Sequence, residues 1–134
     1  MIDRILDIQP DNISGIKQFN DEASFLAIEA CAQLGAYHIR SLMNCTRHVF
    51  LMKIKHCEIF STNLLSGQFL ITAHLIAKSS DAYSYAIRIQ QNNEIYVDGK
   101  FIFAVVDYDK RFQSDILMSY YQSVLYSTIN NKFS

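Results

Sequence analysis

The segment that most restricts how this chain can fold is residues 25–36, an apolar run rich in small side chains. Apolar or small residues cover nearly its whole circumference, a pattern typical of a helix buried on most sides. Its alanines and Gly35 leave room for a sheet to approach closely. We predict a long central helix that starts after an N-cap at Asn20, with Asp21 and Glu22 in its first turn, and ends near Met43.

One carboxylate stands out on this helix. Glu29 and Gln33 are four residues apart and therefore share a side. A carboxylate on a buried helix is costly unless a hydrogen-bond network or a chemical role retains it. Glu29 is therefore our candidate catalytic residue and Gln33 its orienting neighbour. A purely structural carboxylate, hydrogen-bonded to backbone or to Gln33, is the alternative.

Strand-like segments surround the helix. Two short ones, residues 2–8 and 13–19, flank a turn at Pro10, and longer ones rich in Ile, Val, Phe, Tyr and Thr occupy residues 49–60, 68–77, 83–90 and 94–106. Asp98-Gly99 could also form a hairpin turn inside the last segment. One helix against an antiparallel sheet is an α+β arrangement. Residues 113–129 have amphipathic helical spacing, so we expect a domain over 1–112 and an extra C-terminal helix and tail over 113–134.

Composition excludes several classes. With 134 residues, 19% charged residues and a net charge of −1, nothing favours nucleic acid or an anionic membrane surface. No apolar stretch is long enough to insert across a membrane, and the start does not resemble a signal peptide, so we expect a cytoplasmic protein. Cys31, Cys45 and Cys57 lack metal-like spacing and are expected to be reduced thiols. No metal or other cofactor is expected.

Four stretches resemble one enzyme family. Ile2-Asp-Arg-Ile-Leu-Asp-Ile8 resembles the opening "L-V-D-R-V-L-D-I" of the (3R)-hydroxyacyl-acyl-carrier-protein dehydratases of type II fatty-acid synthesis. Ile28-Glu-Ala-Cys-Ala-Gln33 resembles their helix motif "I-E-A-x-A-Q". Leu64-Leu-Ser-Gly-Gln-Phe69 is similar to their turn "V-V-P-G-D-x-L", and Asp98-Gly-Lys100 to "D-G-x-x-V". The resemblance implies the hotdog fold, a curved sheet wrapped around a long central helix, with dimers formed through the sheet edge.

The departures from the family bear on function. The resembled enzymes carry a loop "G-H-F-P-G-H-P-x-x-P-G" before the helix, and its histidine is the catalytic base. Here residues 19–25 run straight into the helix, so the loop is deleted. The family's Arg-Phe pair lacks its arginine, since Ile59-Phe60 stands there. In the resembled enzymes the histidine and the glutamate of one active site come from different subunits.

Two functional hypotheses follow from the resemblance. In the first, the chain forms a heterodimer with a histidine-bearing hotdog subunit, and Glu29 supplies the acid side of a composite dehydratase site. In the second, it is a homodimer that binds an acyl chain or carrier protein, or hydrolyses thioesters with Glu29 as a base for water. The substrate in either case is an acyl-carrier-protein or acyl-CoA thioester.

The remaining candidates are mainly structural. His38 lies nine residues after Glu29 and so on the opposite side of the helix. We expect His48 at the start of a strand. His56 and His74 should lie within strands, where either face is possible. His56 is the one to test, since its strand borders the substrate channel of hotdog enzymes. Cys31 should be core, and Cys57 should point away from its neighbour His56.

Aromatic and basic side chains complete the list. Some aromatics could line an acyl tunnel, although core packing is the favoured interpretation. These are Tyr83, Tyr85, Tyr96, Phe101 and Phe103. Tyr120, Tyr121 and Tyr126 suggest a docking face on the C-terminal helix. Arg40, Arg47, Lys53 and Lys55 are candidate carrier-protein contacts, with ordinary solvated charge as the alternative.

Overall fold

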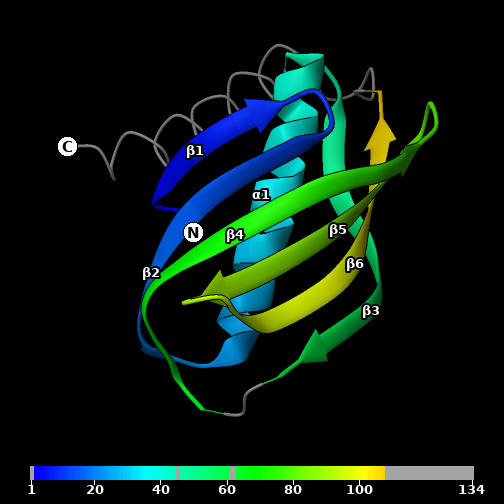
Figure 1. Cartoon of the computed structure of the whole chain (residues 1–134). Helices are drawn as coiled ribbons and strands as arrows, with labels where there is room; N and C mark the ends of the chain where they lie inside the picture. The colour runs from blue at the N-terminus through cyan, green and yellow to red at the C-terminus, as the bar shows by residue number, and fades with distance from the viewer. Residues whose placement is uncertain (1, 45, 61–62, 108–134) are drawn as a thin grey trace.

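One long helix lies across the concave side of a curved six-stranded sheet (Figure 1). The computed structural model describes residues 2–44, 46–60 and 63–107. The elements in chain order are β1 (Arg4–Gln9), β2 (Asn12–Glu22), α1 (Ser24–Met43), β3 (His48–Ile59), β4 (Leu65–Lys78), β5 (Ala82–Gln91) and β6 (Glu94–Val106). No helix among the described residues is long and apolar enough to cross a membrane.

The strands are arranged in the order β1-β2-β4-β5-β6-β3, and every neighbouring pair is antiparallel. The strand that follows the helix therefore lies at the far edge of the sheet, beside the last strand. β1 and β3 are the two edge strands. The expected strands are all present, and their ends differ from the expected ones by three residues at most. The expected helix over 113–129 lies outside the described residues, so the division at residue 112 stays a prediction.

The start of the helix differs from our expectation. Asn20, Asp21 and Glu22 belong to β2, and the helix begins after Ala23, with no acidic residue in its first turn. The strand continues because Glu22 still pairs with Leu65, after an irregularity in which Asp21 takes a φ of 54°. A residue held in a sheet ladder cannot also cap a helix. The end of the helix agrees with expectation, because Asn44 takes a left-handed conformation directly after Met43.

The alternative hairpin turn at Asp98-Gly99 is wrong. Gly99 lies within β6, paired with Cys57 on one side and Ile87 on the other. A Cβ placed there would stand 2.9 Å from the carbonyl oxygen of His56. The glycine therefore permits a close approach of two strands.

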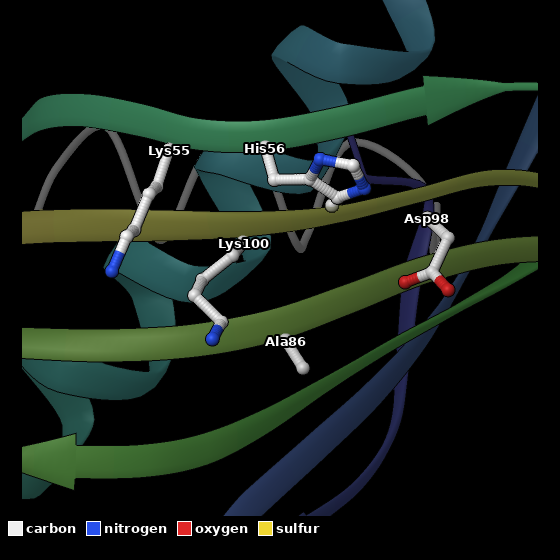
Figure 2. A pocket seen from close by; sticks show the side chains of 6 residues that line it. Lys55, His56, Ala86, Asp98 and Lys100 are labelled. Carbon is white, nitrogen blue, oxygen red and sulfur yellow. The ribbon is translucent and has the colours of Figure 1, made fainter.

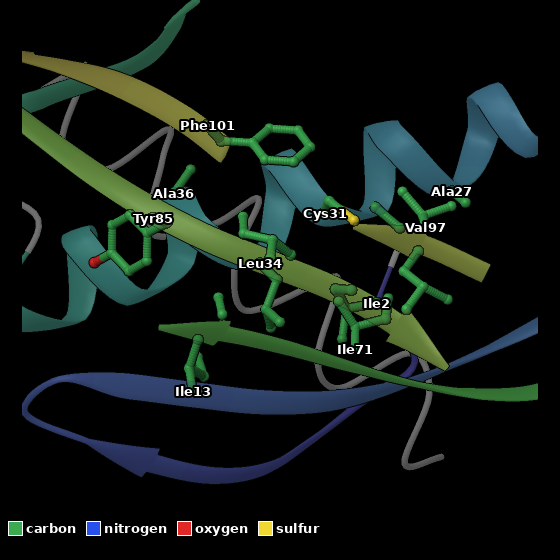
Figure 3. Close-up of a cluster of buried hydrophobic side chains, with 14 of the residues drawn as sticks. Ile2, Ile13, Ala27, Cys31, Leu34, Ala36, Ile71, Tyr85, Val97 and Phe101 are labelled. Atoms are coloured by element: carbon green, nitrogen blue, oxygen red, sulfur yellow. The ribbon is translucent and has the colours of Figure 1, made fainter. Parts of the chain in front are cut away.

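Small residues allow the helix to sit directly on the sheet. The buried helical residues form one stripe, which consists of Ala27, Ala30, Cys31, Leu34, Gly35, Ala36, His38 and Ile39. They pack against inward-facing strand residues such as Ile13, Ile71, Val97 and Phe101 (Figure 3). The other side of the helix is less covered than expected, because Phe25, Glu29 and Leu42 are exposed.

Gly35 is the closest contact between the two layers. A Cβ at this position would lie 2.6 Å from the Phe103 ring, a distance that real Cβ atoms do not adopt. The helix could accept a methyl group here only by moving away from β6. The position of α1 on the sheet thus depends on a residue without a side chain.

We expect Gly35→Ala to destabilise the protein by about 1–3 kcal/mol, because overpacking outweighs the better helix propensity of alanine. Urea unfolding measures the change. In a double-mutant cycle, the alanine should cost less when Phe103→Leu removes the opposing ring. Unchanged or increased stability of Gly35→Ala would show that the ring moves aside freely.

Candidate functional site

An open groove runs between α1 and the first half of β3. Its volume is about 400 Å³. It is lined by Glu29, Ala32, Gln33, Ala36, Arg40, Val49, Phe50, Leu51 and Phe103. The helical members recur every three or four residues and so lie on one side of α1. The alanine side chains are small, which leaves space between the helix and the strand.

Glu29 and Gln33 line this groove together. Glu29 is exposed, and it makes no hydrogen bond or ion pair within the described residues. Among the described residues, neither Gln33 nor a backbone group therefore forms the hydrogen bond to Glu29 that the structural alternative requires. Gln33 Oε1 is buried and has no hydrogen-bond partner among the same residues. A buried acceptor without a donor is costly, so this oxygen is available to a donor from outside the described residues.

Arg40 builds the far end of the groove. Its Nη2 donates a hydrogen bond of 2.8 Å to the carbonyl oxygen of Val49, which ties the last turn of α1 to the start of β3. Of the four basic residues suggested as partner contacts, Arg40 is the one that lines the groove. Arg47 instead donates to the carbonyl oxygens of Ser80 and Val105, a structural role.

His38 is a buried structural residue on the opposite side of the helix. Its Nε2 lies 2.7 Å from the carbonyl oxygen of Gln9, and its Nδ1 lies 2.5 Å from the hydroxyl of Tyr85. A carbonyl only accepts, so Nε2 carries the proton and Nδ1 accepts from the tyrosine. The prediction that His38 faces away from Glu29 is confirmed.

His56 lies on the outer face of the sheet, away from α1. It pairs with Lys100, and the neighbouring Cys57 packs against the core, so His56 faces the other way. His56 contacts Glu58 at 3.0 Å and lines a separate hollow with Lys55, Ala86, Asp98, Gly99 and Lys100 (Figure 2). Of the two faces left open for His56, the structure places it on the outer one, so it does not border the groove beside the helix.

The other two histidines do not line the groove either. His74 is exposed and lies opposite Ala86 on the outer face. His48 is half-buried, and partial burial together with nearby Arg40 lowers the pKa of its imidazole. No histidine of the described residues therefore lines the groove with Glu29.

The cysteines offer no nucleophile to the groove. Cys31 is buried in the core, and burial raises the pKa of its thiol far above the usual range. Partial burial, and then the charge of Asp98, raises the pKa of Cys57. Cys57 packs against the core while His56 is exposed, so the two point apart as expected. Both thiols are free, and Cys45 lies outside the described residues.

The aromatic residues mostly build the core. Tyr83, Tyr85, Phe101 and Phe103 are buried, and Tyr96 packs against them. Phe103 alone among them also lines the groove. Within residues 2–44, 46–60 and 63–107, no three His, Cys, Asp or Glu side chains are placed to hold a metal ion. Tyr120, Tyr121 and Tyr126 lie outside those ranges.

Solved structures show what the fold is similar to. No family model and no curated protein matches the sequence. Thioesterase HI1161 from Haemophilus influenzae matches with a TM-score of 0.69 at 13% identity, over 81% of each chain. A chain of the dehydratase heterocomplex ApeI:P from Xenorhabdus doucetiae matches with a TM-score of 0.66 at 11% identity, over 87% of this chain and 88% of that one.

A third similar structure is smu.793 from Streptococcus mutans bound to acetyl CoA, with a TM-score of 0.67 at 9% identity, over 80% of this chain and 90% of that one. Identities this low show the fold alone. With the six-stranded antiparallel sheet packed on one long helix, these matches show that the chain has the hotdog fold.

We expect Tyr85→Phe to destabilise the protein by about 1–3 kcal/mol, because it leaves the buried Nδ1 of His38 without a donor. Thermal or urea unfolding measures the loss. Tyr96→Phe is the matched control, since the Tyr96 hydroxyl makes no hydrogen bond within the described residues. Equal effects of the two substitutions would contradict the role given to the His38–Tyr85 contact.

Proposed function

We propose that this chain is one subunit of a two-chain hotdog dehydratase acting on 3-hydroxyacyl thioesters in fatty-acid or polyketide-type acyl-carrier-protein metabolism. One observation carries the proposal. Glu29 stands in an open groove whose other wall is the edge strand β3, and no histidine of the described residues lines that groove. The site has the acid-side residue and lacks a base, and its open side is where a second subunit would bind.

The chemistry explains why a second group is needed. Elimination of water from a 3-hydroxyacyl thioester breaks the C2–H bond and the C3–O bond and forms a C2=C3 double bond. A base takes the C2 proton, and an acid protonates the departing hydroxyl. Glu29 is assigned the acid role, and the partner supplies a histidine as the base. A covered, water-poor site is also the setting in which a carboxyl group keeps its proton.

Gln33 supports the same arrangement. Its buried Oε1 has no donor within the described residues, so it can accept a hydrogen bond from a partner or substrate group. Its position one turn after Glu29 on the groove wall suits it to orient the substrate or the carboxyl group. The substrate is a thioester of an acyl carrier protein or of coenzyme A, and the reaction moves only protons and water, so it requires no redox cofactor. Such a subunit would be cytoplasmic.

The comparisons fit this proposal at the level of fold. One similar structure is a dehydratase heterocomplex, and another holds acetyl CoA. A thioesterase is the second candidate, since HI1161 is one and the open groove gives water free access to Glu29. In that case Glu29 would activate water for attack on the thioester carbonyl. A subunit that binds or stabilises a partner without catalysis is the third.

The test begins with purification of the tagged chain from its native cells and identification of the protein that accompanies it in equal amount. We expect a second hotdog protein with a histidine before its central helix. The pair should dehydrate a 3-hydroxyacyl thioester, and neither chain should do so alone. Glu29→Gln should lower the rate of the pair by about 10²- to 10⁴-fold, the usual contribution of one acid or base.

Glu94→Gln is the matched control, because Glu94 is exposed on β6 and does not line the groove. Thiol release by this chain alone, lost in Glu29→Gln, would replace the dehydratase with a thioesterase. An inactive pair whose assembly is unaffected by Glu29→Gln would leave a non-catalytic subunit.

A further inference from the structure

The edge strand β3 exposes a long apolar row that needs a cover. Phe50, Met52 and Ile54 are 47%, 56% and 37% exposed. Ile59 and Phe60 at its end are 44% and 56% exposed. An exposed edge also presents unpaired backbone N–H and C=O groups, which another strand can pair with. β3 is therefore the side of the sheet on which a partner strand would add.

Positive charge lies in the middle of this edge. Lys53 and Lys55 are on β3, and Lys100 lies beside them on β6, opposite His56. In Figure 2 the side chains of Lys55 and Lys100 extend in the same direction, and that of Lys100 ends near Ala86. The strand centre thus carries three ammonium groups within two neighbouring strands.

The nearby carboxylates are already engaged. Glu58 contacts His56 at 3.0 Å, and Asp98 contacts Arg88 at 3.3 Å. Within the described part of the chain, none of the three lysines makes an ion pair. The described residues therefore leave the positive charge at the centre of β3 without a paired carboxylate.

A second copy of the chain is a poor partner for this edge. Two copies would pair β3 with β3 antiparallel about a two-fold axis. With the two-fold axis at residue 53, 54 or 55, a lysine of one copy lies directly opposite a lysine of the other. Like charges placed opposite each other across strands are destabilising. Lysine on an edge strand is a common way to discourage indiscriminate pairing.

We propose that β3 pairs with the edge strand of a different hotdog subunit that carries carboxylates opposite Lys53 and Lys55, and that these lysines select against a homodimer. Burial of the apolar residues stabilises the pairing, and the charges determine which partner strand is selected. This inference rests on the proposed function in taking the partner to be a hotdog subunit. It concerns partner choice and not the reaction.

The experiment uses this chain against a charge-reversed copy of itself as an acidic partner strand. Wild-type chain and Lys53→Glu/Lys55→Glu, with different tags, are mixed in equal amounts at low salt, and dimers are counted by native mass spectrometry. We expect the ratio of mixed to same-chain dimers to rise roughly tenfold above the equal proportion that random assortment gives. The excess should vanish at 1 M salt, where the screening length is about 3 Å. Wild-type chain alone should self-associate more strongly as salt rises.

Two controls separate edge charge from total charge. Lys53→Arg/Lys55→Arg keeps the sign and should pair with wild type no better than wild type does. Arg4→Glu/Lys78→Glu makes the same charge change on β1 and β4, away from this edge, and should give no excess of mixed pairs. The salt titration of the unmodified chain tests the proposal even if the charge-reversed chain does not fold.

Random assortment of the two chains would overturn the inference. So would a wild-type homodimer at low salt whose stability the lysine substitutions leave unchanged. Selective pairing, together with a native pair that does not dehydrate a 3-hydroxyacyl thioester, would instead retain this inference and reject the proposed reaction. The two failures are therefore distinguishable.

Discussion

The close packing of α1 on the concave face of the sheet determines the rest of the structure. Gly35 brings the helix backbone against the Phe103 ring, and the residues that share its stripe are buried in the core. Once that stripe faces the sheet, the helical periodicity turns Glu29 toward solvent at the β3 side. The groove is thus a consequence of core packing, since Ala36 at the margin of the buried stripe and Ala32 beside it have small side chains that leave space next to β3.

A polar contact within the apolar core holds the helix in place along its axis. His38 joins α1 to Tyr85 on β5 and to the backbone of Gln9 at the β1–β2 turn. Dispersion and hydrophobic contacts tolerate small displacements, whereas hydrogen bonds to both ring nitrogens do not. The core therefore combines a close apolar contact at Gly35 with a directional contact one turn later. Together they set the height of Glu29 and Gln33 relative to β3.

Much of the fold could be predicted because its signals are local. The apolar periodicity of the strands and the small-residue helix depends only on neighbouring residues, and both were recognised. The start of the helix was missed, because the capping signal of Asn20 and the acidic residues after it lost to the pairing of Glu22 with Leu65. The face of His56 was left open, since the sequence does not show which face of its strand packs against the helix. Glu29 and Gln33 were placed together correctly because their spacing is helical, but their exposure depends on what covers the helix.

The position of β3 in the sheet also determines when this strand pairs during folding. This strand is the third in the chain, yet within the sheet it pairs with β6, which ends at Val106. Residues 48–59 must therefore wait until about fifty further residues have been synthesised before they gain a neighbour. Pairings so distant along the chain form slowly. The edge formed by β3 consequently joins the sheet last, so any pairing of another chain with this edge follows the synthesis of β6.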